Sequence, residues 1–209
     1  MSIICNNLHH LFASIKRYSF PFDESKMPQN GIYILFEKGE MAHDTERIVR
    51  VGTHTGNGRL TSRLQEHFLK EKKDRSIFRK NIGRAILSKS NDDFLEQWNW
   101  DLTTRENKNK FLPLLDIEKQ KQIEKEVTAY IQEHFSFIVF EVPSKDERLE
   151  LESKIISTVS LCRNCKASST WLGNSSPIKR IRESGLWLVQ GLYKTPLSED
   201  DYIKIKKSL

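Results

Sequence analysis

The sequence predicts a small α/β sandwich in which helices flank a central, mostly antiparallel sheet of three strands. Three segments carry this prediction: residues 31–36, 48–51 and 135–142 are rich in β-branched and aromatic residues and are bounded by turn residues. Between and after them, apolar residues recur at helical spacing. With 209 residues, the chain can form one compact domain that carries an insertion.

The strands and helices alternate in a simple order along the chain. A short helical pattern over residues 8–15 precedes the first strand, and the polar residues 38–46 are expected to form a hairpin-type connection to the second strand. Gly52 ends the second strand and a loop with two further glycines follows. Helical periodicity then recurs over residues 60–68, 77–87, 116–135, 145–161, 178–184 and 201–209.

The expected domain organisation has three parts. Residues 1–27 form an N-terminal arm, residues 28–190 the main domain, and residues 191–209 a C-terminal helical extension. The main domain is expected to contain a helical insertion at about residues 88–134, because this segment separates the second and third strands and its first part has no clean period.

The chain is basic, with 34 Lys and Arg against 28 Asp and Glu and a formal net charge of +6. Such an excess suits a polyanionic partner such as nucleic acid, although ordinary basic proteins share it. No apolar segment approaches the roughly 20 residues that a membrane span needs. The N-terminus lacks the basic region and apolar core of a signal peptide, so we expect a cytoplasmic protein without membrane contact.

The three cysteines do not predict a disulfide framework. Cys162 and Cys165 form a CxxC pair, but no second Cys/His pair at zinc-finger spacing follows them. The sequence therefore favours buried, reduced thiols over a metal site at Cys5, Cys162 and Cys165.

Arg63 and His67 are four residues apart, so a helix presents them on one face. A guanidinium matches phosphate oxygens, and an imidazole can donate to phosphate or transfer a proton near neutral pH. In isolation such a pair is most often a solvated helix edge. Tyr33, in the first strand, is by itself most often a core aromatic. It could act as a general base only beside a cation such as Arg63 or beside a metal-bound water.

Glu152 lies in the helix that follows the third strand. One carboxylate, completed by water and substrate oxygens, is a common way to hold Mg²⁺. Glu150 faces roughly the opposite side of that helix, and both could simply be solvated. Asn174 could hydrogen-bond a phosphate or a catalytic group, or it could be a turn residue beside Gly173.

Several basic and aromatic side chains could contact nucleic acid through phosphates or stacking. The basic ones expected to do so are Arg50, Arg59, Lys179 and Arg180. For Trp98, Trp100 and Trp171, partial burial is the more common outcome.

Taken together, these segments resemble the GIY-YIG nuclease superfamily, and its restriction-endonuclease branch in particular. Gly31-Ile32-Tyr33 matches the first half of the name motif letter for letter, and Arg50-Val51-Gly52 takes the place of the second half. Four later residues match, in order, the arginine and histidine of the helix motif, the metal-binding glutamate and the following asparagine: Arg63, His67, Glu152 and Asn174. The resemblance covers roughly residues 28–174.

The resemblance implies a stand-alone, restriction-type DNA endonuclease that hydrolyses phosphodiester bonds with a single Mg²⁺, or Mn²⁺ in its place. It implies that Tyr33 is the general base and that Arg63 stabilises charge on the scissile phosphate. His67 assists proton transfer or phosphate contact, Glu152 holds the metal and Asn174 braces the site. Recognition of a palindrome would require a homodimer, and restriction would involve a cognate methyltransferase encoded nearby.

The sequence departs from the family pattern at its second motif, where Arg50 replaces a tyrosine and the loop to Arg63 is longer. Thr53 or His54 could fill the vacant position, and His54 is the expected catalytic substitute. The change also supports an alternative function, in which the chain is a DNA-binding or regulatory protein that has lost catalysis on a GIY-YIG fold.

Overall fold

The computed structural model describes residues 3–209 and contains a four-stranded sheet in the order β1-β4-β2-β3. All neighbouring strands are antiparallel. The strands are β1 (Tyr18–Ser19), β2 (Gly31–Ala42), β3 (Thr45–Gly52) and β4 (Phe135–Glu141). The predicted α/β class with an antiparallel sheet is confirmed. β1 was not predicted, because a strand of two residues carries no alternation that could reveal it.

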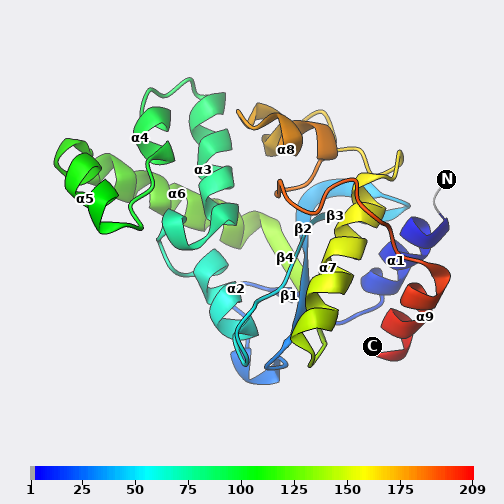
Figure 1. Ribbon diagram of the computed structural model, residues 1–209. Coiled ribbons are helices and arrows are strands. Elements are labelled where there is room, and N and C mark those ends of the chain that lie inside the picture. The colour runs from blue at the N-terminus through cyan, green and yellow to red at the C-terminus, as the bar shows by residue number, and fades with distance from the viewer. Residues whose placement is uncertain (1–2) are drawn as a thin grey trace.

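Helices cover both faces of this sheet (Figure 1). Alternate residues of β2 point to opposite faces, so Tyr33 and Leu35 pack in one core and Ile32 and Ile34 in the other. The first core is completed by α2 (Leu60–Phe68), α3 (Ile77–Lys89) and α6 (Ile117–His134). The second is completed by α1 (Ile3–Ala13), α7 (Lys145–Ser160) and α9 (Glu199–Lys207).

The predicted helices from α2 onward agree with the structure to within two residues at each end. Shorter helical segments appear in stretches without a clear period, and they include four 3₁₀ turns. They are η1 (Glu24–Lys26), η2 (Lys73–Arg75), α4 (Leu95–Asn99), α5 (Arg105–Phe111), η3 (Leu112–Leu114) and η4 (Leu172–Ser175), whereas α8 (Lys179–Ser184) lies where a helix was predicted. Within residues 3–209, no helix is both long and apolar enough to cross a bilayer.

The hairpin between β2 and β3 is longer than predicted. Residues 38–46, expected as a loose connection, belong mostly to the two strands, and only His43 and Asp44 form the turn. Both have positive φ, 53° and 61°, as a two-residue turn matched to strand twist requires. Hydrophobic periodicity could not reveal these strand ends, because β2 carries the buried carboxylates of Glu37 and Glu40 there.

The insertion is tied to the rest of the molecule by a buried tryptophan. Trp98 of α4 donates from Nε1 to the carbonyl oxygen of Lys80, at 2.9 Å, and is fully buried. A Cβ at Gly83 of α3 would lie 2.3 Å from its ring, so only glycine admits the indole there. Trp98 is therefore a packing residue and is not available for stacking on a base.

Candidate functional site

The candidate site lies where the phenol of Tyr33 crosses the end of the edge strand β3. Tyr33 pairs with Gly52 in the sheet, and a Cβ at Gly52 would lie 2.2 Å from the Tyr33 oxygen. Only glycine lets the ring pass. In Figure 1, α2 and α3 flank this end of the sheet on one side and α7 on the other, so helices from both faces can contribute side chains.

A chain of buried hydrogen bonds fixes the Tyr33 hydroxyl. Its oxygen lies 2.8 Å from Nε2 of His67, and Nδ1 of His67 lies 2.7 Å from the hydroxyl of Ser76. Ser76 is itself fixed because it caps α3 by accepting from the backbone N–H of Arg79. Burial keeps the pKa of His67 well below its ordinary value, and nearby arginines, Arg63 first, act in the same direction.

This environment makes His67 a neutral positioning residue. With one ring nitrogen toward Tyr33 and the other toward Ser76, the imidazole donates at one nitrogen and accepts at the other. It is fully buried behind Tyr33. The structure therefore does not place His67 where it could contact a phosphate, one of its two expected roles.

Arg63 brings a positive charge to the same place. Its Nη1 donates to Glu66 Oε2 at 2.8 Å and to the carbonyl oxygen of Arg75 at 2.9 Å, which holds the half-buried side chain against α2. Burial acts to lower the pKa of Arg63, but the Tyr33 phenol and the Glu66 carboxylate outweigh it and raise that pKa. A fixed guanidinium thus lies close to the Tyr33 oxygen.

Glu152 reaches the site from α7, on the other face of the sheet. Its Oε1 accepts from the backbone N–H of Thr53 at 3.1 Å, and the Thr53 hydroxyl donates to the carbonyl oxygen of Gly31 at 2.7 Å. The carboxylate is thereby tied to the ends of both β2 and β3. Burial raises the pKa of Glu152, whereas Arg50, the Thr53 N–H and Arg63 act to lower it.

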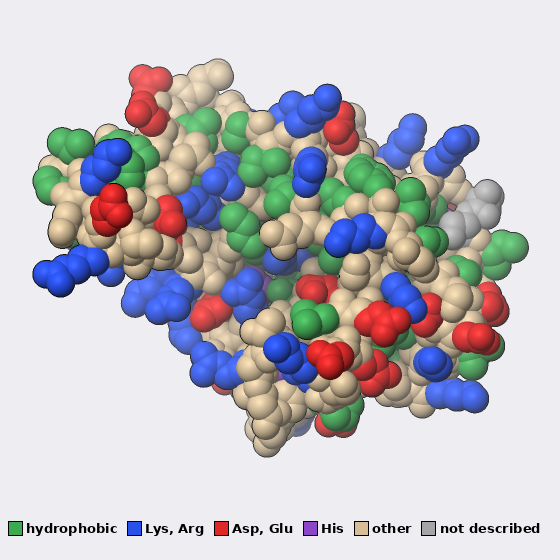
Figure 2. All heavy atoms as spheres, viewed as in Figure 1, with side chains coloured by type: hydrophobic (Ala, Val, Ile, Leu, Met, Phe, Trp, Pro, Cys, Tyr) green, Lys and Arg blue, Asp and Glu red, His purple; other side chains and the backbone are tan. Residues whose placement is uncertain are grey.

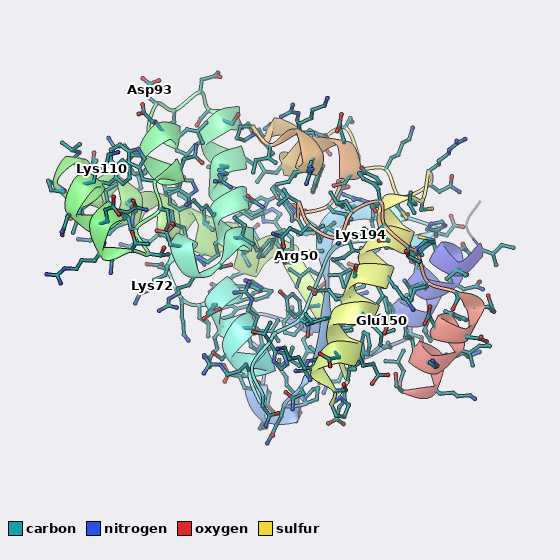
Figure 3. The ribbon with its side chains drawn as sticks, in the orientation of Figure 1. Arg50, Lys72, Asp93, Lys110, Glu150 and Lys194 are labelled. Carbon is teal, nitrogen blue, oxygen red and sulfur yellow. The ribbon has the colours of Figure 1, made fainter. Side chains whose placement is uncertain are left out.

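Glu152 lines a surface hollow of about 390 Å³, the Glu152 hollow, which also includes Arg50, Asn81 and Lys194. Figure 3 shows Arg50 between α3 and α7, with Lys194 close by, and Figure 2 shows this region as a depression where basic and acidic side chains meet. Nη1 of Arg50 donates to the carbonyl oxygen of Trp187. Its Nε and the Nδ2 of Asn81 are buried and have no partner among residues 3–209.

Asn81 and Lys194 were not predicted. Asn81 is one polar residue in an otherwise ordinary helix, and Lys194 lies in an irregular segment, so neither has a pattern that could have revealed it. Two unpaired buried donors are costly in a folded chain unless a ligand accepts from them.

A second hollow of about 460 Å³ lies beside the first and is lined by Arg63, Arg59, Thr53 and His54. The expected catalytic role of His54 does not fit its contacts. Its Nε2 accepts from the backbone N–H of Gly31 at 3.3 Å, and its Nδ1 donates to the carbonyl oxygen of Gly56 at 2.6 Å. Both ring nitrogens are therefore occupied, and His54 orders the loop. Arg59 is exposed and lines the hollow with its charge available.

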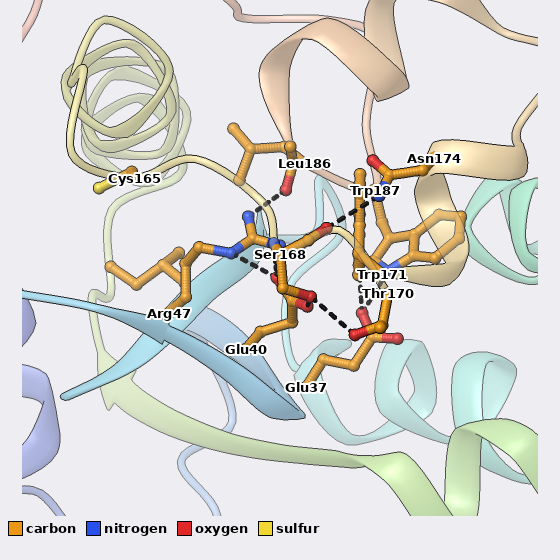
Figure 4. Close-up of polar contacts among 12 residues, drawn as sticks. Glu37, Glu40, Arg47, Cys165, Ser168, Thr170, Trp171, Asn174, Leu186 and Trp187 are labelled. Carbon is orange, nitrogen blue, oxygen red and sulfur yellow. Dashed lines mark hydrogen bonds and ion pairs between the residues drawn. The ribbon is translucent and has the colours of Figure 1, made fainter.

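Asn174 belongs to a different polar cluster (Figure 4). Its amide donates to the carbonyl oxygens of Ser168 and Ser169, at 2.8 and 3.2 Å, and it lines neither hollow. In the same cluster the buried Glu37 accepts from the indole N–H groups of Trp171 and Trp187, each at 2.7 Å. In the structure Asn174 therefore braces the segment that follows α7.

The two expected DNA contacts of α8 differ in position. Arg180 donates to the carbonyl oxygen of Val189 at 3.2 Å and lines a third hollow, which shares Val189 and Lys194 with the Glu152 hollow. Lys179 instead pairs with Glu183 at 3.6 Å on the exposed face of the helix. Arg180 is therefore the better placed of the two to extend the site.

Glu152 fits a single divalent cation of the Mg²⁺ type. One carboxylate oxygen is held by the backbone, and among residues 3–209 the other takes no hydrogen bond while the side chain faces the Glu152 hollow. One fixed carboxylate that leaves room for water and phosphate oxygens is a common donor set for this cation. When bound, the ion would stabilise negative charge on a phosphate as a Lewis acid.

The prediction for the cysteines needs correction. Cys5, Cys162 and Cys165 are buried, as expected. The lack of a Cys/His pair after Cys165 does not exclude a metal site, because the residues that meet Cys165 come earlier in the chain. Ligand atoms of Cys5, His9, His43 and Cys165 all lie within 4.8 Å of one another.

A model of the GIY-YIG domain family matches residues 6–199, and thus nearly the whole chain. Searches of curated proteins and of solved structures give no significant match.

Proposed function

The chain belongs to the GIY-YIG domain family, and on that premise we propose that it is a divalent-metal-dependent endonuclease acting on DNA. The observation that carries the proposal is the meeting, at one end of β3, of the Tyr33 phenol, the Arg63 guanidinium and the Glu152 carboxylate. These groups come from both faces of the sheet, and packing alone gives no reason to gather them.

In this proposal Tyr33 first releases its hydroxyl proton to solvent, and the resulting phenolate accepts a proton from the attacking water. Arg63 places a positive charge beside the phenol oxygen, where negative charge develops. His67 donates from Nε2 to that oxygen and accepts from Ser76 at Nδ1, which keeps the phenol oriented. Because its pKa is low, His67 stays neutral at physiological pH and does not store the proton.

The Glu152 hollow receives the scissile phosphate. Arg50 and Asn81 line it, each with a buried donor nitrogen that has no partner among residues 3–209, and Lys194 adds a positive charge. Donors that are already oriented toward developing charge are worth about 3–4 kcal/mol each to a transition state. Glu152, which also lines the hollow, would hold Mg²⁺, with Mn²⁺ as a substitute.

The test is cleavage of plasmid DNA with Mg²⁺ by the full chain and by Glu152→Ala. The matched control is Glu150→Ala, because Glu150 lies on the same helix but is exposed and pairs with Lys154 at 2.7 Å. We expect Glu152→Ala to lose about 100-fold or more in rate, and the control to keep the wild-type rate. Full activity in Glu152→Ala would refute the assigned metal ligand. A wild-type chain that cleaves with no divalent metal would refute the mechanism.

One observation favours the alternative, a regulatory protein that binds DNA without cutting it. Arg50, at the second motif, is buried and bonded to the Trp187 carbonyl, so no tyrosine hydroxyl stands there. Tight DNA binding without cleavage, with Mg²⁺ and with Mn²⁺, would establish this alternative in place of the nuclease.

Within the nuclease assignment we propose a restriction-type enzyme that acts as a homodimer and has a cognate methyltransferase encoded nearby. The exposed basic residues Lys70, Lys72 and Arg75 follow α2, so they could extend a DNA path from Arg59 toward the insertion. Digestion of phage DNA to discrete fragments, and resistance after methylation, would support this role, whereas random nicking would contradict it.

A further inference from the structure

A second metal centre is indicated by the cluster of cysteine and histidine side chains at the far end of the β2–β3 hairpin. Cys5 and His9 come from α1, His43 from the hairpin turn and Cys165 from the turn after α7. We propose that Cys5, His9, His43 and Cys165 bind one structural Zn²⁺, independently of the Mg²⁺ of the proposed nuclease site.

The distances fit a tetrahedral ion. Bonds of about 2.3 Å to sulfur and 2.0 Å to nitrogen place the ligand atoms of a tetrahedral zinc site about 3.3–3.8 Å apart. The Sγ atoms of Cys5 and Cys165 are 3.4 Å apart, and Cys165 Sγ lies 3.3 Å from His43 Nε2 and 3.9 Å from His9 Nε2. A modest closure around an ion would satisfy all four ligands.

The hydrogen bonds of His9 leave the correct nitrogen available. Its Nδ1 donates to the carbonyl oxygen of Cys5 at 2.9 Å, which fixes the tautomer. The backbone N–H of Ile48 approaches Nε2 at a long 3.4 Å, as it would approach an unprotonated nitrogen. Metal-binding histidines commonly donate their other N–H to a carbonyl in this way, and the ion would replace the weak contact with Ile48.

Burial and charge agree with a closed structural site. Cys5, His9 and Cys165 are almost completely buried. On binding, Zn²⁺ displaces the thiol protons of Cys5 and Cys165, so two thiolates, two neutral imidazoles and the ion form an uncharged group. An uncharged group can be buried at little cost, whereas two unpaired thiolates could not.

The position of the cluster separates it from the proposed nuclease site. His43 is at the turn before β3, and the candidate site is at Gly52, where β3 ends. A strand of this length spans about 20–25 Å at roughly 3.3 Å per residue. Cys165 also lies beyond the Glu40–Arg47 pair in Figure 4. The ion would join α1, the hairpin and the segment after α7, three segments that are distant in sequence.

The test uses the full chain, purified under reducing conditions, and elemental analysis for zinc. We expect about one zinc per chain, and a Co²⁺-substituted protein with the absorption bands of tetrahedral thiolate coordination. His43→Ala and Cys165→Ser should lose most of the metal, while His10→Ala, on the exposed side of α1, should retain it. A strong zinc chelator should lower the melting temperature, and added Zn²⁺ but not Mg²⁺ should restore it.

Four results would overturn the proposal. One is a folded, reduced wild-type chain that binds no zinc when titrated with the metal. Another is a chain two mass units lighter under non-reducing conditions, because a disulfide would then occupy the cluster. A third is retention of one zinc by His43→Ala. The fourth is loss of zinc in Cys162→Ser together with retention of zinc in His9→Ala. Cys162 Sγ lies 3.4 Å from His43 Nε2, so Cys162 would then be a ligand in place of His9.

Discussion

Removal of a single oxygen tests whether Tyr33 acts in the chemistry or only in the packing. In Tyr33→Phe the ring still crosses Gly52, and the hydrogen bond of 2.8 Å to His67 Nε2 is lost. His67 is fully buried, so its Nε2 faces only the space left by that oxygen. Nε2 of His67 then has no partner in the cavity left by one oxygen.

The expected loss of stability follows from that unpaired nitrogen. A buried polar group without a partner costs about 1–3 kcal/mol. For a domain of this size, each kcal/mol lowers the melting temperature by about 2–4 °C, so the variant should melt about 2–12 °C below the wild type. Domains of this kind are stable by at least about 5 kcal/mol, so the variant remains more than about 95% folded.

Because the variant stays folded, its cleavage rate reports on chemistry. We expect plasmid cleavage to fall about 100-fold or more, a loss typical for removal of a general base, with DNA affinity unchanged. Cleavage and melting should be measured on the same preparation, with His67→Gln as a second variant. A lower melting temperature with full cleavage would refute the general base and leave Tyr33 a packing residue. An unchanged melting temperature would refute the hydrogen-bond geometry.

Three further predictions concern the surroundings of this pair. Gly52→Ala places a Cβ 2.2 Å from the Tyr33 oxygen, so we expect displacement of the phenol and a cleavage rate lower by about tenfold or more, measured on plasmid DNA. The pKa of His67 is well below 6.5 in the native state, so below that pH the unfolded chain binds a proton that the native chain does not. The free energy of unfolding should therefore fall as the pH drops below 6.5, by at most about 1.4 kcal/mol per pH unit. Urea titrations at several pH values should show this slope reduced in His67→Gln, and an equal slope would contradict it. In the native protein the buried Arg47 pairs with the Glu40 carboxylate at 2.6 Å. Glu40→Ala removes this partner, so the free energy of unfolding, measured by denaturant titration, should fall by about 3–5 kcal/mol.

Periodicity and turn residues were enough to predict the sheet and the longer helices, because both depend on local burial patterns. Residues 31–36 and 117–134 show this well, since each presents a continuous apolar run or stripe to a core. The outer half of the hairpin was not predictable in this way. There Glu37 and Glu40 are buried by specific donors from residues 168–187, and such partners leave no local pattern.

The same distinction applies to the site. Tyr33, Arg63 and Glu152 could be proposed because their elements were predictable and a family motif set their order, and the structure brings them together. Asn174 could not be placed, because its position depends on an irregular segment whose course is set by tertiary contacts. The Cys5 and His9 pair was overlooked for a related reason. Its partners lie in the turn of the β2–β3 hairpin and after α7, far away in sequence, so spacing alone could not join them.

Arg50 shows why a degenerate motif need not mean a lost activity. A tyrosine at this position could offer one hydroxyl, whereas Arg50 lines the Glu152 hollow with a positive charge even though its Nη1 bonds to Trp187. Its charge also acts to lower the pKa of Glu152, against the effect of burial. The carboxylate must be ionised to bind a metal, so this arginine favours the competent form. In Arg50→Tyr the pH at which cleavage falls off on the acid side should therefore rise. An unchanged acid limit, measured with Mg²⁺ in excess, would show that Arg50 has no part in preparing Glu152.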